Sequence, residues 1–213
     1  MRLRAVAWDV DGTLVDSEGL HHRSLLAGSS LWGVDLSDLG DEQFRGVHMA
    51  DVWAALRGRM PRDLDEAAWL QAITEHYIAN RSALRPLPGA VEAVEALAAL
   101  HVPQACVSNS HRYIVEANLD ALGVLGRMAF TIAFEDVSAG KPDPEPYRMA
   151  TRWFGLDPVE VLAVEDSRSG TLSALGAGLP VALCEPIADA WLGDVTEIAS
   201  VLEVLRWFGP EAA

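Results

Sequence analysis

The chain has 213 residues, of which 50% are hydrophobic and 22% charged, and this composition permits one well-packed core with a modest second module. Its formal net charge of −15 disfavours binding to the phosphate backbone of nucleic acids. No stretch approaches the roughly 18 consecutive apolar residues of a membrane-spanning helix. The two cysteines, Cys106 and Cys184, lie in apolar runs and are expected to be reduced core thiols. We therefore expect a cytoplasmic protein without a nucleic-acid or membrane partner. We also expect a monomer or weak homodimer.

Apolar segments and segments of helical periodicity alternate along most of the chain. Runs rich in Val, Ala and Ile predict buried strands at residues 3–10, 102–108, 130–134, 161–165 and 181–184. Apolar spacing near 3.6 residues predicts helices at residues 88–100, 111–123, 145–155 and 169–178. This alternation predicts an α/β fold with a doubly wound parallel sheet.

Residues 16–85 interrupt the alternation of strand and helix. They contain no convincing strand, but they carry helical patterns at residues 49–60 and 65–80. A segment with two prolines and a glycine, residues 84–90, then returns the chain to the earlier pattern. We predict a sheet domain formed by residues 1–15 and 86–213, with an all-helical domain, residues 16–85, inserted after the first strand.

Polar residues follow four of the predicted strands, at the edge where a parallel sheet binds its ligands. In chain order they are Asp9 and Asp11, then Ser108, Asn109 and Ser110, then Lys141, then Glu165 and Asp166. In extended chain the spacing of Asp9 and Asp11 points both carboxylates to one side, so a cation must offset their repulsion. With Glu165 and Asp166 as further ligands, an all-oxygen site of this kind suits Mg²⁺ and leaves room for a phosphate oxygen.

Each of these signals has an ordinary structural explanation when it is taken alone. Asp and Gly are common turn residues after a strand. Ser108, Asn109 and Ser110 are suited to capping the helix that follows them. The combination of four strand ends nevertheless favours a binding or catalytic site.

Four motifs, DVDGTLVDSE, VSNS, GKPDPEPY and VEDSRSG, occur in the order and approximate spacing that typify the haloacid dehalogenase superfamily. The chain resembles the hydrolases of this superfamily that carry a helical cap after the first strand, and the resemblance spans nearly the whole sequence. It implies a Rossmann-like core, an all-helical cap domain and hydrolysis of phosphoric monoesters. The presence of Asp11 favours phosphate esters, because the dehalogenase branch typically lacks this second aspartate.

The resemblance also implies roles for individual residues. Asp9 matches the nucleophile that becomes an aspartyl-phosphate, and Asp11 matches the general acid that later serves as general base. Ser108 matches the hydroxyl that holds a phosphate oxygen, and Lys141 matches the cation that neutralises the phosphoryl group.

The resemblance implies the metal ligands, and the sequence offers further candidates for contact with the substrate. The Mg²⁺ ligands are expected to be Asp9, Glu165, Asp166 and the backbone carbonyl of Asp11. Additional candidates for contact with the substrate are Thr13 and Asn109 and, within the inserted segment, Glu18, His21 and Arg45.

The resulting hypothesis is a Mg²⁺-dependent phosphatase that acts on a small phosphorylated metabolite, a sugar or polyol phosphate. One alternative is a hexose-phosphate mutase, since the β-phosphoglucomutase group shares the cap. Met49, however, stands where that group has an arginine for the distal phosphate. The other alternative is a catalytically silent module that binds a phosphorylated metabolite. Such a module has no need of the full set of Asp9, Asp11, Ser108, Lys141 and Asp166.

Overall fold

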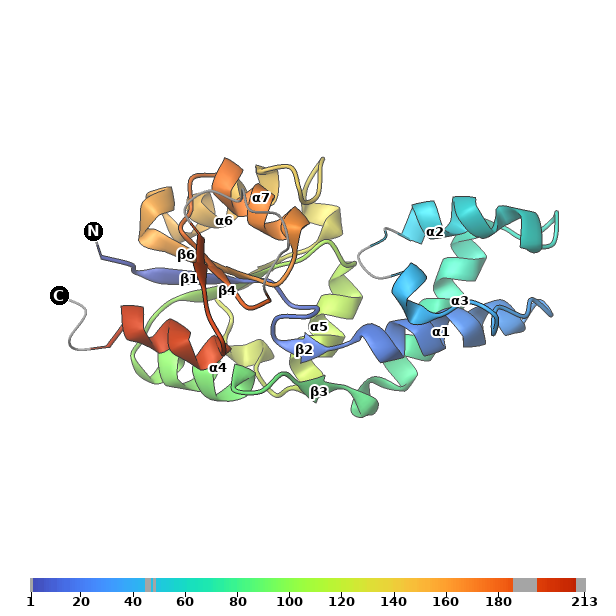
Figure 1. Cartoon of the computed structure of the whole chain (residues 1–213), viewed down its shortest axis with the longest axis horizontal. Coiled ribbons are helices and arrows are strands. Elements are labelled where there is room, and N and C mark those ends of the chain that lie inside the picture. Colours follow the sequence, from blue (N-terminus) through green and yellow to red (C-terminus); the bar gives the residue numbers. More distant parts are fainter. Residues whose placement is uncertain (1, 45–46, 48, 186–194, 210–213) are drawn as a thin grey trace. The chain divides into compact units, whose positions relative to one another are not determined.

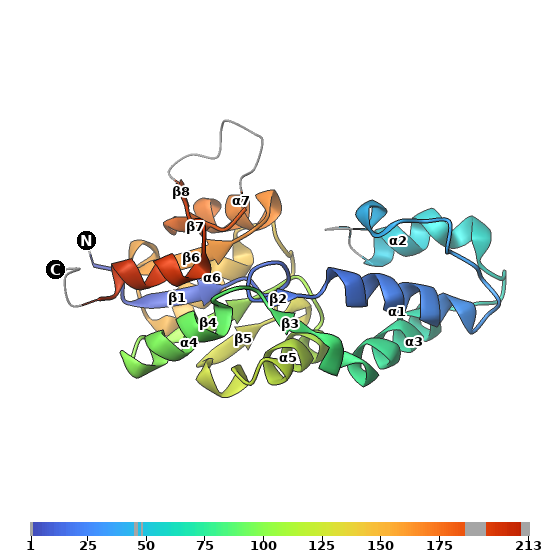
Figure 2. The ribbon, with the colours of Figure 1, turned by 60° about the horizontal axis from the view of Figure 1, so that its bottom comes forward.

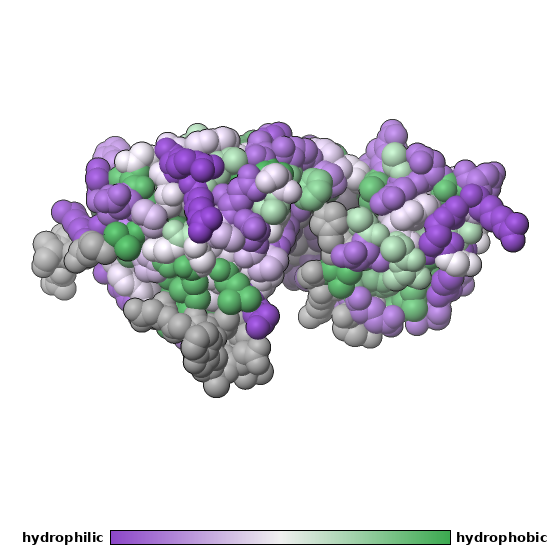
Figure 3. Space-filling model, turned by 90° about the horizontal axis from the view of Figure 1, so that it is seen from above, coloured by the Kyte–Doolittle hydropathy of each residue, from purple (hydrophilic) through white to green (hydrophobic). Residues whose placement is uncertain are grey.

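The chain divides into two compact units, Met1–Asp16 with Arg85–Ala213, and Ser17–Leu84. The computed structural model describes residues 2–44, 47, 49–185 and 195–209. Within these ranges, no helix combines the length and the hydropathy of a bilayer-spanning segment. Polar side chains cover most of the face shown in Figure 3, and apolar ones form separate patches between them.

The first unit, the sheet unit, is built on six parallel strands in the order β5-β4-β1-β6-β7-β8. The strands are β1 (Ala5–Trp8), β4 (Gln104–Val107), β5 (Phe130–Ile132), β6 (Val161–Glu165), β7 (Val181–Leu183) and β8 (Val195–Glu197). Every residue of β1, β4, β6 and β7 is buried, which accounts for their largely apolar sequences. The predicted α/β fold with a parallel sheet is confirmed, and β8 extends the sheet at one edge.

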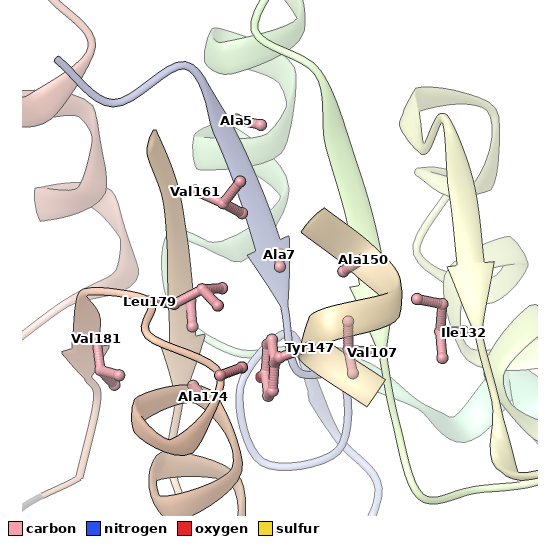
Figure 4. Packing of buried hydrophobic residues seen from close by; sticks show 12 residues of the cluster. Ala5, Ala7, Val107, Ile132, Tyr147, Ala150, Val161, Ala174, Leu179 and Val181 are labelled. Carbon is pink, nitrogen blue, oxygen red and sulfur yellow. The ribbon is translucent and has the colours of Figure 1, made fainter. Parts of the chain in front are cut away.

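Helices cover both faces of this sheet (Figures 1 and 2). One face carries α4 (Ala90–Ala99) and α5 (Arg112–Ala121), with the short helix η7 (Val201–Trp207) beside α4. The other face carries α6 (Glu145–Phe154) and α7 (Arg168–Gly176). Tyr147 and Ala150 of α6 share a buried cluster with Ala7 of β1 and Val107 of β4 (Figure 4). This packing fixes α6 against the centre of the sheet.

The chain leaves and re-enters the sheet unit through a two-stranded antiparallel ribbon. Its strands are β2 (Val15–Asp16) and β3 (Arg85–Pro86), which pair in the register Val15↔Pro86 and Asp16↔Arg85. The amide of Leu87 also donates to the carbonyl of Leu14 at 3.0 Å. The two ends of the inserted segment are therefore held side by side.

The second unit, the helical unit, contains α1 (Glu18–Ser30), α2 (Met49–Leu56) and α3 (Glu66–Ala79). Helices α2 and α3 lie within the segments predicted to be helical, whereas α1 was not predicted. Asp65 caps α3 by accepting a hydrogen bond from the amide of Ala68 at 3.3 Å. The core of this unit is apolar and includes Leu25, Val52 and Trp69.

Candidate active site

The carboxyl ends of β1 and β6 carry Asp9 and Glu165, and the loop between β5 and α6 brings Lys141 into contact with both. The backbone amide of Asp9 donates to the carbonyl of Val164 at 2.9 Å, which fixes Asp9 relative to β6. Lys141 Nζ lies 2.7 Å from Asp9 Oδ1 and 2.6 Å from Glu165 Oε1. The side chains of Lys141, Asp9 and Glu165 are only 4%, 11% and 0% exposed. One ammonium group thus bridges two buried carboxylates that come from distant parts of the sequence.

The carboxylates of this site outnumber the cations, and the pKa values reflect the imbalance. Burial raises the pKa of Asp9 to about 7; the charge of Lys141 opposes this shift and that of Glu165 adds to it. Burial also raises the pKa of Asp166 to about 8, with a further contribution from the charge of Asp9. Burial alone would lower the pKa of Lys141, but Asp9 and Glu165 outweigh it and raise that pKa above its ordinary value. A second cation would relieve the excess negative charge.

Asp9, Glu165 and Asp166 fit the requirements of a hard divalent cation. One carboxylate oxygen from each of the three lies within 4.8 Å of the others. Asp9 Oδ2 is buried and has no hydrogen-bond partner among the described residues. An unpaired buried carboxylate oxygen is costly, and oxygen-only donor sets suit Mg²⁺. The donor set therefore fits the predicted metal.

Two glycines, Gly12 and Gly170, lack side chains where Asp166 and Glu165 need room. Gly12 has a φ of 84°, and a Cβ at this position would lie 2.0 Å from Asp166 Oδ2. A Cβ at Gly170 would lie 1.9 Å from Glu165 Oε2. Any side chain at either position would displace an acid of the cluster. The contact of Gly170 with Glu165 was not predicted, because the sequence does not reveal what a glycine faces.

Asp11 is held by a different pair of residues. Ser110 Oγ donates to Asp11 Oδ2 at 2.9 Å, and Asn118 Nδ2 donates to Asp11 Oδ1 at 2.9 Å. Asn118 belongs to α5 and is fully buried. The contact with Asn118 was not predicted, although an asparagine among the apolar residues of a helix indicates a buried polar side chain that needs a hydrogen-bond partner. The metal contact predicted for the Asp11 carbonyl stays a prediction.

The loop after β4 supports the segment that carries Lys141. Asn109 Nδ2 donates to the carbonyl of Lys141 at 2.9 Å, and Asn109 Oδ1 accepts from the amide of Lys141 at 2.8 Å. Ser108 is buried, and its Oγ accepts from the amide of Ser110 at 3.0 Å. The Asn109 amide therefore positions Lys141, whereas the substrate contacts predicted for Ser108 and Asn109 stay predictions.

Tyr147 completes the surroundings of Lys141 and Glu165, and sequence reasoning did not identify it. Its hydroxyl donates to Glu165 Oε1, and its ring centroid lies 5.3 Å from Lys141 Nζ. Burial raises the pKa of Tyr147 well above its ordinary value, so the phenol remains a donor. Tyr147, the last residue of the GKPDPEPY motif, is thus a buried side chain that donates a hydrogen bond to Glu165 of the site.

The remaining predicted residues lie away from these contacts or outside the described part of the chain. Thr13 is fully buried, and its hydroxyl has no partner among the described residues. Glu18 and His21 belong to α1 in the helical unit, where the His21 ring lies 4.5 Å from that of Tyr77. Arg45 lies outside the described residues. The substrate contacts predicted for these four residues stay predictions.

Comparisons with known proteins agree on one family. A family model described as haloacid dehalogenase-like hydrolase matches residues 3–178. The chain is 32% identical to "Validoxylamine A 7'-phosphate phosphatase" from Streptomyces hygroscopicus subsp. limoneus, with 92% of this chain and 95% of that protein covered. It is 29% identical to "Hexitol phosphatase A" from Escherichia coli (strain K12), with 89% of this chain and 86% of that protein covered.

Solved structures share the fold over nearly the whole chain. A crystal structure of mutant CbbY from Rhodobacter sphaeroides in complex with xylulose-(1,5)bisphosphate superimposes with a TM-score of 0.84. That protein is 25% identical to this chain, and the match covers 97% of this chain and 99% of the other. The similarity therefore includes both units rather than the sheet alone.

Proposed function

The chain belongs to the haloacid dehalogenase-like hydrolase family, and we propose that it is a Mg²⁺-dependent phosphatase. The proposed substrate is a sugar or polyol phosphate, and the proposed intermediate is an aspartyl-phosphate on Asp9. Membership confirms the family predicted from the four motifs. The observation that carries the proposal is that the ammonium of Lys141 bridges Asp9 and Glu165, while Asp9 Oδ2 has no hydrogen-bond partner among the described residues. The substrate class is supported by relatives named for phosphates of validoxylamine A and of hexitols.

In the first half of the proposed reaction, a carboxylate oxygen of Asp9 attacks the phosphorus atom. The bond from phosphorus to the ester oxygen breaks, and Asp11 gives its proton to the departing alcohol. Lys141, whose pKa is raised by Asp9 and Glu165, stays protonated and offsets the repulsion between Asp9 and the phosphate dianion. The products of this half are the free alcohol and the phosphorylated Asp9.

In the second half, a water molecule attacks the phosphorus atom and transfers a proton to Asp11. The bond between phosphorus and the Asp9 oxygen breaks, which releases inorganic phosphate and regenerates the carboxylate. Asp11 thus gains the proton that it lost in the first half. Two displacements with lower barriers replace one difficult attack by water.

The residues proposed to hold the metal are Asp9, Glu165 and Asp166, together with the backbone carbonyl of Asp11. Bound Mg²⁺ would neutralise charge on the phosphoryl oxygens and on Asp9. Ser108, Asn109 and Thr13 are proposed to contact the substrate from the sheet unit.

We assign catalysis to residues 1–15 and 86–213 and the role of a cap to residues 16–85. Glu18, His21 and Arg45 are the candidates by which the cap selects the substrate. The reaction is proposed to take place in the cytoplasm.

Hydrolysis of para-nitrophenyl phosphate tests the proposal. The purified protein should release nitrophenolate with Mg²⁺ and stop when EDTA is added. Asp9→Asn should abolish turnover while circular dichroism and thermal unfolding show an intact fold. The matched control is Asp157→Asn, an exposed aspartate of the sheet unit outside the described site, which should retain activity. Turnover by Asp9→Asn at the wild-type rate would remove Asp9 from its role.

Two further measurements address the alternatives. No turnover of any member of a panel of sugar and polyol phosphates would favour a silent binding module. Incubation with a β-hexose 1-phosphate and a trace of hexose bisphosphate should yield inorganic phosphate. Formation of the 6-phosphate isomer instead would indicate a mutase.

A further inference from the structure

We infer that Asn118 positions Asp11 for proton transfer, with Ser110 as its partner on the other carboxylate oxygen. The inference rests on the proposed function, because it assumes that Asp11 exchanges protons with the leaving group and with water. Asn118 lies outside the four sequence motifs, on the helix that follows VSNS, and acts only through Asp11, so it is a positioning residue.

Both carboxylate oxygens of Asp11 accept a hydrogen bond, one from Asn118 and one from Ser110, and we call this pair of bonds the clamp. Asn118 Nδ2 lies 2.9 Å from Asp11 Oδ1, and Ser110 Oγ lies 2.9 Å from Asp11 Oδ2. The two donors come from different elements, helix α5 and the loop that precedes it. Two donors on opposite oxygens fix both the position and the plane of the carboxylate.

The chemistry of the two donors differs in a way that suits proton transfer. The Nδ2 group of Asn118 can only donate, so Oδ1 remains an acceptor whether or not Asp11 carries a proton. The Ser110 hydroxyl can donate to Oδ2 or accept from it. Asn118 therefore holds the carboxyl group while Ser110 reorients as the proton arrives and leaves.

The location of Asn118 argues against a role in packing alone. It lies on the buried side of α5 with Ile114, Val115 and Leu119, where an apolar side chain would ordinarily be preferred. Burial of an amide costs free energy unless hydrogen bonds offset it. The bond to Asp11 is such an interaction, and it reaches across 107 positions of the sequence.

Another buried amide of the same unit provides a matched control. Gln104 is 1% exposed; it accepts from Trp8 Nε1 at 3.0 Å and donates to the carbonyl of Val94 at 3.0 Å. Its bonds hold the fold together and do not involve Asp11. Gln104→Leu therefore removes a buried amide at a similar structural cost without touching the proposed clamp.

The test compares Asn118→Leu, Asn118→Ala and Gln104→Leu on two substrates of nearly the same shape, phenyl phosphate and para-nitrophenyl phosphate. Phenolate is the poorer leaving group and depends more on a proton from Asp11. Both Asn118 variants should lower kcat/KM for phenyl phosphate about tenfold or more, and for para-nitrophenyl phosphate much less. Gln104→Leu should lower the melting temperature while keeping the wild-type ratio between the two substrates.

A second readout follows the base role of Asp11. During turnover of para-nitrophenyl phosphate, intact-mass spectrometry should detect phosphorylated Asn118→Leu enzyme, because hydrolysis of the aspartyl-phosphate needs a positioned base. If Asn118→Leu and Asn118→Ala behave alike, the volume of the new side chain is not the cause of the altered kinetics. Asn118→Ala also replaces Asn118→Leu in the test if leucine disrupts α5. Unchanged substrate ratios and no phosphoenzyme in either variant would overturn the inference. Such a result would leave the proposed function intact if the wild type turns over and Asp9→Asn does not, whereas an inactive wild type would refute the function itself.

Discussion

The helical unit and the sheet unit differ in the charge and the pairing of the polar side chains that they bury. In the helical unit, Trp69 Nε1 donates to Ser29 Oγ at 2.9 Å, and Ser24 Oγ bonds to His76 Nδ1 at 3.0 Å. In the sheet unit, neutral amides such as Gln104 are paired as well, but Asp9 and Glu165 also form a buried charged cluster with Lys141, and this cluster is incomplete. Over the described residues, the buried side-chain atoms without a hydrogen-bond partner are Asp9 Oδ2, Thr13 Oγ1 and Thr171 Oγ1, all in the sheet unit.

The difference separates polar groups that maintain a fold from polar groups that await a ligand. A paired buried hydrogen bond is satisfied within the protein and adds specificity to the packing. An unpaired buried carboxylate oxygen lowers stability until a cation or substrate supplies the missing interaction. Substitutions in the two units should therefore differ in their effect on stability and in their dependence on Mg²⁺.

Lys141→Met should have the largest effect, because it leaves Asp9 and Glu165 buried together without the cation that joins them. We expect turnover of para-nitrophenyl phosphate to fall by about 10³-fold or more. The free energy of unfolding should fall by about 3–5 kcal/mol, as measured by urea titration. The control is Arg127→Met, which breaks an exposed pair with Glu95 and should change little. Equal losses in the two variants would contradict the importance of the buried cluster.

Gly170→Ala should have the next largest effect, because the added Cβ would lie 1.9 Å from Glu165 Oε2. Overpacking of this kind costs about 1–3 kcal/mol, and it should also lower activity by moving Glu165. Gly126→Ala is the matched control, since among the described residues its added Cβ would meet no atom within 4 Å beyond its own neighbours in the chain. Thermal unfolding and steady-state kinetics measure both variants. The comparison fails if Gly170→Ala is as stable and active as Gly126→Ala.

The stabilisation that Mg²⁺ provides should increase with pH. The pKa values of about 7 for Asp9 and about 8 for Asp166 exceed the ordinary value of 3.8. The folded, metal-free protein therefore retains protons that the unfolded chain releases, and its stability falls as pH rises from about 4 to about 8. Mg²⁺ competes with these protons, so the rise in melting temperature with Mg²⁺ should be larger at pH of about 8 than at about 6. Equal increments at the two pH values would exclude this linkage.

Ser29→Ala should have the smallest effect, and one that is independent of Mg²⁺. It leaves the indole N–H of the buried Trp69 without its partner and should cost about 1–2 kcal/mol. The increment in melting temperature on adding Mg²⁺ should equal that of the wild type. If Mg²⁺ no longer raises the melting temperature of Ser29→Ala, the proposed independence of the helical unit from the metal is wrong.

The sequence predicted the sheet well because its central strands are buried on both faces. Each of β1, β4, β6 and β7 lies within an apolar run that any reader of the sequence can find. Strands β2 and β3 have two residues each and cannot display a period. Strand β8 was missed because two of its three residues are exposed and its sequence, VTE, contains no apolar run. Helix α1 was missed because glycine, serine and two histidines interrupt its apolar pattern.

The contacts of the candidate site were only partly predictable. Asp9 follows β1 directly and Glu165 ends β6, so the parallel topology places both at one edge of the sheet, the edge to which the loop carrying Lys141 also belongs. Asn118 and Tyr147 lie inside helices, and their contacts depend on how each helix is rotated against the sheet. A pattern of residue types identifies the buried side of a helix, but it does not specify which polar atom meets which partner.

The ribbon of β2 and β3 makes the helical unit easy to remove or replace. Because Asp16 pairs with Arg85, the sheet unit meets its insertion at two points separated by a single strand spacing. A short turn is long enough to span that gap, and a foreign domain with neighbouring termini is equally easy to graft there. The helical unit can thus be exchanged as a single block, while the path of the chain through the sheet unit stays the same.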